Sequence, residues 1–285
     1  MVATIVVADH AGACFGVERA LSLVEGVLSA GGTPVHTMGP LIHNPQVVAS
    51  LEGRGVDAVE EKDIASLPAG DRVVLRSHGV VPQVTEEALA AGLEVVDATC
   101  PYVKKVHRAA QRLAAEGYEV VVVGQAGHPE VEGILGHAPG AHVVGSAEDA
   151  RSLPGAKRVG VVVQTTTEKP LLDEVVSELL ARFGEVRVHN TICEATRERQ
   201  EAAARLADAV DVMVVIGGKN SANTTRLAEI CSSRVPTCHV EAADELDAAF
   251  FDGAAAVGVT AGASTPASQI EEVVAAIRSL AGDRP

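Results

Sequence analysis

Short apolar runs alternate with longer amphipathic segments along the whole chain. The runs at 4–9, 119–124 and 212–218 are mostly apolar, and each is followed by a segment whose apolar residues recur at helical spacing. Apolar runs of this length predict strands that are buried on both faces, and the longer segments predict the helices that cover them. The pattern therefore predicts an α/β fold with parallel sheets.

Three of the five cysteines lie at the same kind of junction, between a strand-like run and a helical run. Cys14, Cys100 and Cys193 are separated by 86 and 93 residues, and each separation is close to one small α/β unit. We therefore expect three similar modules in a pseudo-threefold (trefoil) arrangement around one central site. Their predicted ranges are 14–99, 100–192 and 193–281, with the N-terminal strand of residues 1–13 packing on the third.

The positions of these three cysteines indicate metal ligation. Strand-to-helix junctions of parallel sheets lie where ligands bind, and helix N-termini favour a thiolate. A zinc site completed by a histidine and an iron–sulfur cluster both remain open, and a cluster with three cysteines leaves one iron free to bind a substrate oxygen. Cys231 and Cys238 lack this context, so we assign both to packing.

Each predicted module also carries two polar turns that follow strands. Their side chains suit recognition of a phosphate-like group, and several are equally good helix N-caps. The candidates are His43, His78, His128, Thr165, Ser221, Asn223 and Ser264. Glu130 lies two residues after His128 and, in a closed pocket with an anionic substrate, would have a raised pKa and could donate a proton.

Composition and charge limit the classes of partner and the cellular compartment that we expect for this protein. A formal net charge of −15 argues against a nucleic-acid surface, and no apolar run approaches the ~20 residues needed to cross a bilayer. Five widely spaced cysteines do not resemble a secreted disulfide framework, and we read no signal peptide at the N-terminus. We expect a cytoplasmic monomer. The G-x-G-x-x-G spacing of nicotinamide and flavin sites is absent, so any electrons come from outside.

Motifs spread over nearly the whole chain resemble the LytB family of 4-hydroxy-3-methylbut-2-enyl diphosphate reductases. The stretches that carry this resemblance are HAGACFGVERA (10–20), GPLIHNPQVV (39–48), RSHGV (76–80), DATCPYVKKVH (97–107), GHPEVEG (127–133), QTTT (164–167), TICEATRERQEA (191–202), GGKNSANTTRLAE (217–229) and GVTAGASTP (258–266). Their number and order make the resemblance specific. One departure is Ala222, where the family often has serine, so a side-chain contact is lost there while the backbone N–H could still reach a phosphate oxygen.

The resemblance implies reductive dehydroxylation of (E)-4-hydroxy-3-methylbut-2-enyl diphosphate to isopentenyl and dimethylallyl diphosphate, the last step of the non-mevalonate isoprenoid pathway. It implies one [4Fe–4S] cluster per chain and a ferredoxin or flavodoxin as electron donor. By resemblance, the cluster ligands are Cys14, Cys100 and Cys193, and the diphosphate contacts are His43, His78, Ser221, Asn223 and Ser264. His128, Thr165 and Glu130 would handle the hydroxyl end, with Glu130 at the head of proton delivery.

Three other interpretations compete with this one. Quinolinate synthase is another three-cysteine, three-lobed cluster protein, but the motifs above do not resemble it. A redox sensor that holds a cluster without turnover has no need for a diphosphate pocket and Glu130. A zinc-binding α/β protein would differ from the iron–sulfur alternatives in its metal content.

Overall fold

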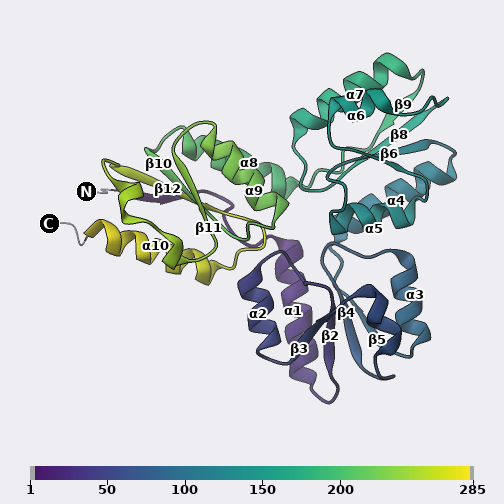
Figure 1. The fold of residues 1–285 in the computed structure, drawn as a ribbon, viewed down its shortest axis with the longest axis horizontal. Coiled ribbons are helices and arrows are strands. Elements are labelled where there is room, and N and C mark those ends of the chain that lie inside the picture. Colours follow the sequence, from purple (N-terminus) through teal and green to yellow (C-terminus); the bar gives the residue numbers. More distant parts are fainter. Residues whose placement is uncertain (1–3, 283–285) are drawn as a thin grey trace. The chain divides into compact units, whose positions relative to one another are not determined.

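The computed structural model describes residues 4–282, in which twelve strands form three four-stranded sheets (Figure 1). Every pair of neighbouring strands is parallel. The prediction of three α/β modules with parallel sheets is therefore confirmed. None of the helices in the described range has the length and apolarity that a bilayer span requires.

The first sheet has the strand order β3-β2-β4-β5. Its core gathers Met38, Ile64, Val73 and Leu75 with apolar residues of α3. Its strands are β2 (Val35–Met38), β3 (Val56–Val59), β4 (Arg72–Leu75) and β5 (Glu94–Asp97). Its helical elements are α1 (Phe15–Ala30), α2 (Pro45–Glu52), the 3₁₀ helix η1 (Glu61–Ser66) and α3 (Pro82–Ala90).

The second sheet, of order β7-β6-β8-β9, is covered on both faces. Along β6, Val120 and Val122 pack with α4 and α5, whereas Val121 and Val123 pack with α7 on the other face. This alternation explains why β6 is apolar from Val120 to Val123. The strands are β6 (Glu119–Val123), β7 (His142–Val144), β8 (Val159–Val163) and β9 (Val186–Val188). The helices are α4 (Pro101–Ala115), α5 (Pro129–His137), α6 (Ala147–Ser152) and α7 (Lys169–Arg182).

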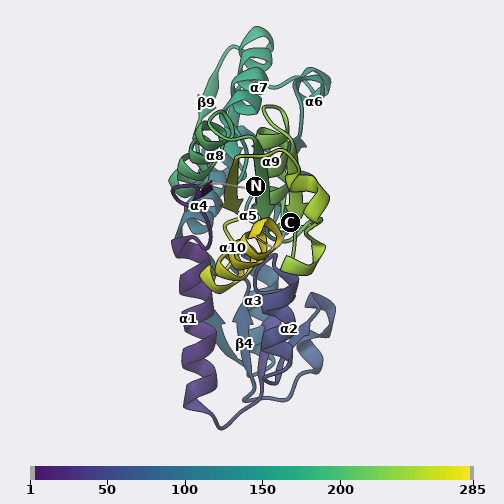
Figure 2. The same cartoon turned by 90° about the vertical axis from the view of Figure 1, so that its left-hand side faces the viewer.

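The third sheet has the order β1-β12-β10-β11, so the first strand of the chain belongs with the last ones. Both views show the C-terminal helix α10 on this module (Figures 1 and 2). The strands are β1 (Thr4–Val7), β10 (Val212–Ile216), β11 (Thr237–Val240) and β12 (Ala256–Ala261). The helical elements are α8 (Glu194–Ala207), α9 (Ala222–Ser232), η2 (Ala243–Glu245), η3 (Ala248–Phe251) and α10 (Ala267–Gly282).

The three sheets share one topology. In each, two central strands pair with one another (β2 with β4, β6 with β8, β10 with β12), and an outer strand pairs with the second of them. These outer strands are β5, β9 and β1, and the next cysteine along the chain after each is Cys100, Cys193 and Cys14 respectively. The three cysteines are therefore topologically equivalent, because each follows the outer strand of its own sheet.

The described chain forms two compact units. One consists of the described residues 4–17, 43–47 and 194–282 and holds the third sheet. The other consists of residues 18–42 and 48–193 and holds the first and second sheets. The three-module boundaries predicted from the cysteine spacing stay a prediction, as does the arrangement of the modules around one centre.

Candidate active site

The backbone holds the three equivalent cysteines in the same way. The amide N–H of Cys100 donates to the carbonyl of Ser77 at 2.9 Å, that of Cys193 to Thr165 at 3.0 Å, and that of Cys14 to Ala263 at 3.0 Å. Ser77, Thr165 and Ala263 lie in the polar turns after β4, β8 and β12, the second central strand of each sheet. Each sheet thus fixes one cysteine against its own polar turn.

All three cysteines are partly exposed, and a helix begins directly after each of them. Cys100 is the N-cap of α4, and Pro101 occupies the first turn, where its missing N–H costs nothing. Cys231 and Cys238 differ. Cys231 lies in the core under β10, Cys238 packs against the core of the same sheet, and burial raises the pKa of both thiols to about 11. Their assignment to packing agrees with this burial.

No group of three or more His, Cys, Asp or Glu side chains is assembled as a metal site within residues 4–282. Cys14 belongs to the unit of the third sheet, and Cys100 and Cys193 belong to the other unit. The donor set nevertheless fits a cluster held by three thiolates. The three cysteines occupy equivalent positions at helix starts, and thiolates are the usual ligands of iron–sulfur clusters.

Glu130 is a buried carboxyl group, only 2% exposed, that joins two turns of the second sheet. It lies in the first turn of α5, and its side chain accepts hydrogen bonds from Thr165 N at 2.6 Å and from Thr165 Oγ1 at 2.7 Å. Burial raises the pKa of Glu130 to about 7, against the lowering effect of the Thr165 hydrogen bonds. A carboxyl group with this pKa is suited to proton transfer near neutral pH.

His128 caps the same helix through its ring. Its Nδ1 accepts the amide N–H of Glu130 at 3.1 Å, which leaves the neutral ring with its proton on Nε2. His78, in the turn after β4, approaches this ring edge-on with centroids 5.8 Å apart. The structure thus brings His78, His128, Glu130 and Thr165 together within the unit of the first and second sheets.

The remaining candidates gather at the third sheet. The Ser264 hydroxyl donates to the carbonyl of His43 at 2.9 Å, and the Asn44 amide donates to the carbonyl of Ser264 at 2.9 Å. Gly218 lies against the same turn, since a Cβ there would be 3.0 Å from the His43 carbonyl oxygen. Ser221 caps α9 by accepting the amide N–H of Thr224 at 3.3 Å.

Asn223 is the clearest sign of a ligand in this group. It lies in the first turn of α9 and is only 5% exposed, and neither atom of its side-chain amide has a hydrogen-bond partner among the described residues. A buried amide without partners costs free energy unless a ligand or water satisfies it. The first turn of a helix is also where backbone N–H groups attract anions. The site therefore suits an anionic group such as a phosphate.

Known proteins match this chain over nearly its whole length. The model of the LytB protein family matches residues 5–278. The chain belongs to the LytB family. It is 53% identical to the 4-hydroxy-3-methylbut-2-enyl diphosphate reductase of Geobacter sulfurreducens over 279 residues, which cover 97% of each chain. It is 50% identical to the protein of the same name from Citrifermentans bemidjiense, covering 98% of this chain and 99% of the other.

Solved structures of LytB-type reductases agree with these matches. One is described as (E)-4-hydroxy-3-methyl-but-2-enyl diphosphate reductase, the terminal enzyme of the non-mevalonate pathway. It matches with a TM-score of 0.73 and 46% identity, covering 98% of this chain and all of the other. The Plasmodium falciparum reductase matches with a TM-score of 0.92 and 29% identity, covering 98% of this chain and 89% of the other.

In this LytB-family chain, a buried histidine that the sequence did not single out joins two of the polar turns. His107 on α4 is 6% exposed and stacks on His137, with ring centroids 4.1 Å apart. Burial and the neighbouring His137 lower its pKa to about 3, so the ring is neutral. It fits against Gly79 of the His78 turn and against Gly133 of α5, one turn beyond Glu130. The ring thereby packs the first sheet's turn against the second sheet's helix.

The contact between His107 and Gly79 predicts a large effect for Gly79→Ala. Gly79 has φ of +78°, and a Cβ there would be 2.7 Å from His107 Cε1. We expect the free energy of unfolding to fall by roughly 2–4 kcal/mol, measured by urea unfolding, because backbone strain and overpacking add. Gly140→Ala is the matched control. It has φ of +86° with nothing within 4 Å of the new Cβ, so it reports the backbone strain alone, and an equal loss there would rule out the clash.

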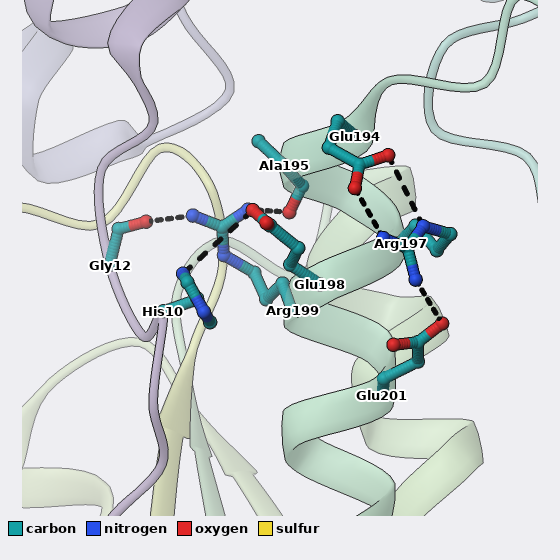
Figure 3. Close-up of polar contacts among 8 residues, drawn as sticks. All are labelled: His10, Gly12, Glu194, Ala195, Arg197, Glu198, Arg199 and Glu201. Atoms are coloured by element: carbon teal, nitrogen blue, oxygen red, sulfur yellow. Dashed lines mark hydrogen bonds and ion pairs between the residues drawn. The ribbon is translucent and has the colours of Figure 1, made fainter.

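Arg199 is a second functional candidate that sequence reasoning missed. It is 3% exposed on α8, and its guanidinium donates to the carbonyl of Gly12 and to that of Ala195, both at 2.7 Å (Figure 3). The preceding residue on α8, Glu198, has a carboxylate oxygen 3.9 Å from Nδ1 of His10, which lies in the same loop as Gly12. This side of α8 thus holds the loop that leads to Cys14, while Arg197 pairs with glutamates of its own helix.

Proposed function

We propose that this chain reduces (E)-4-hydroxy-3-methylbut-2-enyl diphosphate to isopentenyl and dimethylallyl diphosphate, as the terminal step of the non-mevalonate isoprenoid pathway. The observation that carries the proposal is the buried Glu130–Thr165 pair, whose carboxyl group has a pKa of about 7. The names of the full-length relatives support the same reaction.

We propose one [4Fe–4S] cluster per chain, held by Cys14, Cys100 and Cys193. Their equivalent positions and amide hydrogen bonds support this assignment. When bound, such a cluster supplies electrons one at a time and a Lewis-acidic iron. The overall reaction consumes two electrons and two protons, breaks the bond between carbon and the hydroxyl oxygen, and releases water.

The protein's own groups divide between the two ends of the substrate. His43, His78, Ser221, Asn223 and Ser264 bind the diphosphate with hydroxyl, amide and ring donors. Protonated Glu130 gives its proton to the departing hydroxyl, and Thr165 orients the carboxyl group through its two hydrogen bonds. His128 presents its Nε2–H, because its Nδ1 accepts the amide of Glu130.

Metal analysis of protein purified without oxygen tests the cofactor, and turnover tests the reaction. We expect a brown protein with about four iron atoms per chain. We also expect it to convert the allylic diphosphate when reduced viologen supplies the electrons. A colourless protein that contains zinc would overturn the cluster assignment, and an iron-loaded protein without turnover would overturn the reaction.

Asn223→Asp is expected to raise KM for the substrate by at least about tenfold, because a carboxylate would face the diphosphate where an amide now lies unpaired. Steady-state kinetics with viologen as reductant measure the change. The exposed Asn220→Asp in the preceding turn is the matched control for charge, and we expect its KM to stay near that of the unaltered protein. Equal KM values in the two variants would remove Asn223 from the diphosphate site.

The remaining parts of the proposal concern the electron donor, the compartment and the oligomeric state. We propose an external ferredoxin or flavodoxin as electron donor and a cytoplasmic monomer as the working form. The odd number and wide spacing of the five cysteines support a reducing compartment.

A further inference from the structure

A basic groove lies between α4 and the segment 188–191, which begins with the last residue of β9. It has a volume of about 510 Å³, and all of its residues belong to the same compact unit. Its cationic lining comes from one helix face, and its other wall is polar. The principal lining residues are Lys105, Arg108, Arg112, His189, Asn190 and Thr191.

The groove is a positively charged region on an acidic protein. The net charge of the chain is −15, yet α4 carries no acidic residue between Pro101 and Ala115. Within the described part of the chain, Lys105, Arg108 and Arg112 are exposed and form no ion pair, whereas the neighbouring Lys104 pairs with Asp97 and Arg187 with Glu116. Burial, followed by the charges of Arg112 and Arg187, lowers the pKa of His189.

The walls of the groove are continuous in sequence with the segments that carry two of the three equivalent cysteines. One wall is the helix that begins after Cys100, so Lys105 is about 7.5 Å along the helix axis from that cysteine. The other wall ends at Thr191, two residues before Cys193. A partner in the groove would therefore contact the segments that lead to Cys100 and to Cys193.

Exposed apolar groups accompany the cations. Tyr102 is 38% exposed, with the Lys105 ammonium 4.8 Å from its ring centroid, and Val188 of the groove wall is 39% exposed. Aromatic and cationic side chains in one patch are typical of protein interfaces. Cations spread over about two turns of α4 in an open groove suit the surface of a protein better than a single small anion.

We propose that this groove is the docking surface for an acidic one-electron carrier protein that reduces the site beside Cys100 and Cys193. The proposal rests on the proposed function, since it supplies the two electrons that the reaction consumes. Each of two reduced carriers docks in turn, gives up one electron and leaves oxidised. The cations guide the encounter and set its dependence on salt.

The test compares two electron sources in the iron-loaded protein. In the triple variant Lys105→Glu, Arg108→Glu and Arg112→Glu, we expect kcat/KM with a reduced acidic ferredoxin to fall at least about tenfold. The rate with reduced viologen should stay near that of the unaltered protein. The corresponding triple glutamine variant should give a smaller loss, and salt should lower the ferredoxin rate of the unaltered protein more than that of either variant.

Arg278→Glu, an exposed cation on α10, is the matched control for charge reversal. We expect it to leave the ratio of ferredoxin-driven to viologen-driven rate unchanged. The same ratio in both triple variants as in the unaltered protein would overturn the docking surface, whatever their absolute rates. If the unaltered protein shows no turnover with reduced viologen, that result would instead count against the proposed function. Failure of the docking surface and failure of the proposed function are therefore distinguishable. A reduced flavodoxin as second carrier should give the same ranking.

Discussion

Glu130→Gln is expected to lower kcat by about 10²- to 10⁴-fold, the range that a positioned acid contributes. Glutamine keeps the shape of the side chain but has no carboxyl proton to give, and its amide oxygen can still accept from Thr165. Single-turnover kinetics with viologen measure the loss. Iron content and KM should change little, because Glu130 is neither a cysteine ligand nor among the groups around Asn223. Glu132→Gln, at an exposed position on the same helix, is the control and should leave kcat unchanged.

The pH dependence follows from the same carboxyl group. Its pKa of about 7 means that the acid form is lost as pH rises through 7, so kcat should fall on the alkaline side. Thr165→Val removes a hydrogen bond that lowers this pKa, so the inflection should move to higher pH, whereas Thr165→Ser should keep it near 7. A profile that is unchanged in Glu130→Gln would contradict the assignment.

Protein stability should respond to the same titration. Between pH 4.5 and about 7 the folded protein holds a proton on Glu130 that the unfolded chain has released. The contribution of this group to the free energy of unfolding is therefore fully present below pH 4.5 and is lost as pH rises through about 7. Glu130→Gln removes that slope, which urea unfolding across this pH range would detect.

Cys100→Ser is expected to abolish turnover. It should also leave less than about one of the four iron atoms in each chain. A serine hydroxyl stays protonated near neutral pH and is a poor substitute for a thiolate. Iron analysis and the visible spectrum of protein purified without oxygen measure the loss. Cys14→Ser and Cys193→Ser should behave alike, since the three sites are equivalent in topology and in their amide hydrogen bonds.

Cys238→Ser is the matched control for that series. Its thiol packs against the core of the third sheet and has a pKa of about 11, so the substitution should cost some stability but leave the iron content unchanged. Full iron occupancy in Cys100→Ser would exclude Cys100 as a ligand. Loss of iron in Cys238→Ser to the same extent would show that serine substitution acts through folding and not through ligation.

Periodicity and turn chemistry were enough to predict much of this molecule. The sequence predicts the long apolar strands β6, β8, β10 and β12, because a fully buried strand needs a nearly unbroken apolar run. It also predicts the polar turns that follow these strands. The short strands β3 and β7 were not anticipated, because runs such as Val56–Val59 carry too few apolar residues to stand out. The pairing of Glu130 with Thr165 was suggested only by the family resemblance, since the two residues are on different turns.

His107 and Arg199 illustrate what the sequence could not supply. A histidine or arginine in an amphipathic helix is usually a solvated side chain, and nothing in the local pattern marks these two as buried. Their roles depend on what lies opposite: two glycines from different sheets for His107, and the Gly12 carbonyl for Arg199. Buried polar residues of this kind become visible only when the tertiary contacts are known.

The position of β1 in the third sheet has a consequence for the order of events during synthesis. Thr4 pairs with Ala256, and the amide of Cys14 bonds to the carbonyl of Ala263, so the start of the chain finds its place only after nearly all of it has left the ribosome. Domains that appear earlier fold as they emerge, whereas contacts between distant segments form late. Ser77 and Thr165 precede their cysteines, so Cys100 and Cys193 acquire their backbone partners during translation, and Cys14 is the last of the three to be fixed. Loading of a metal cluster would accordingly follow release of the finished chain.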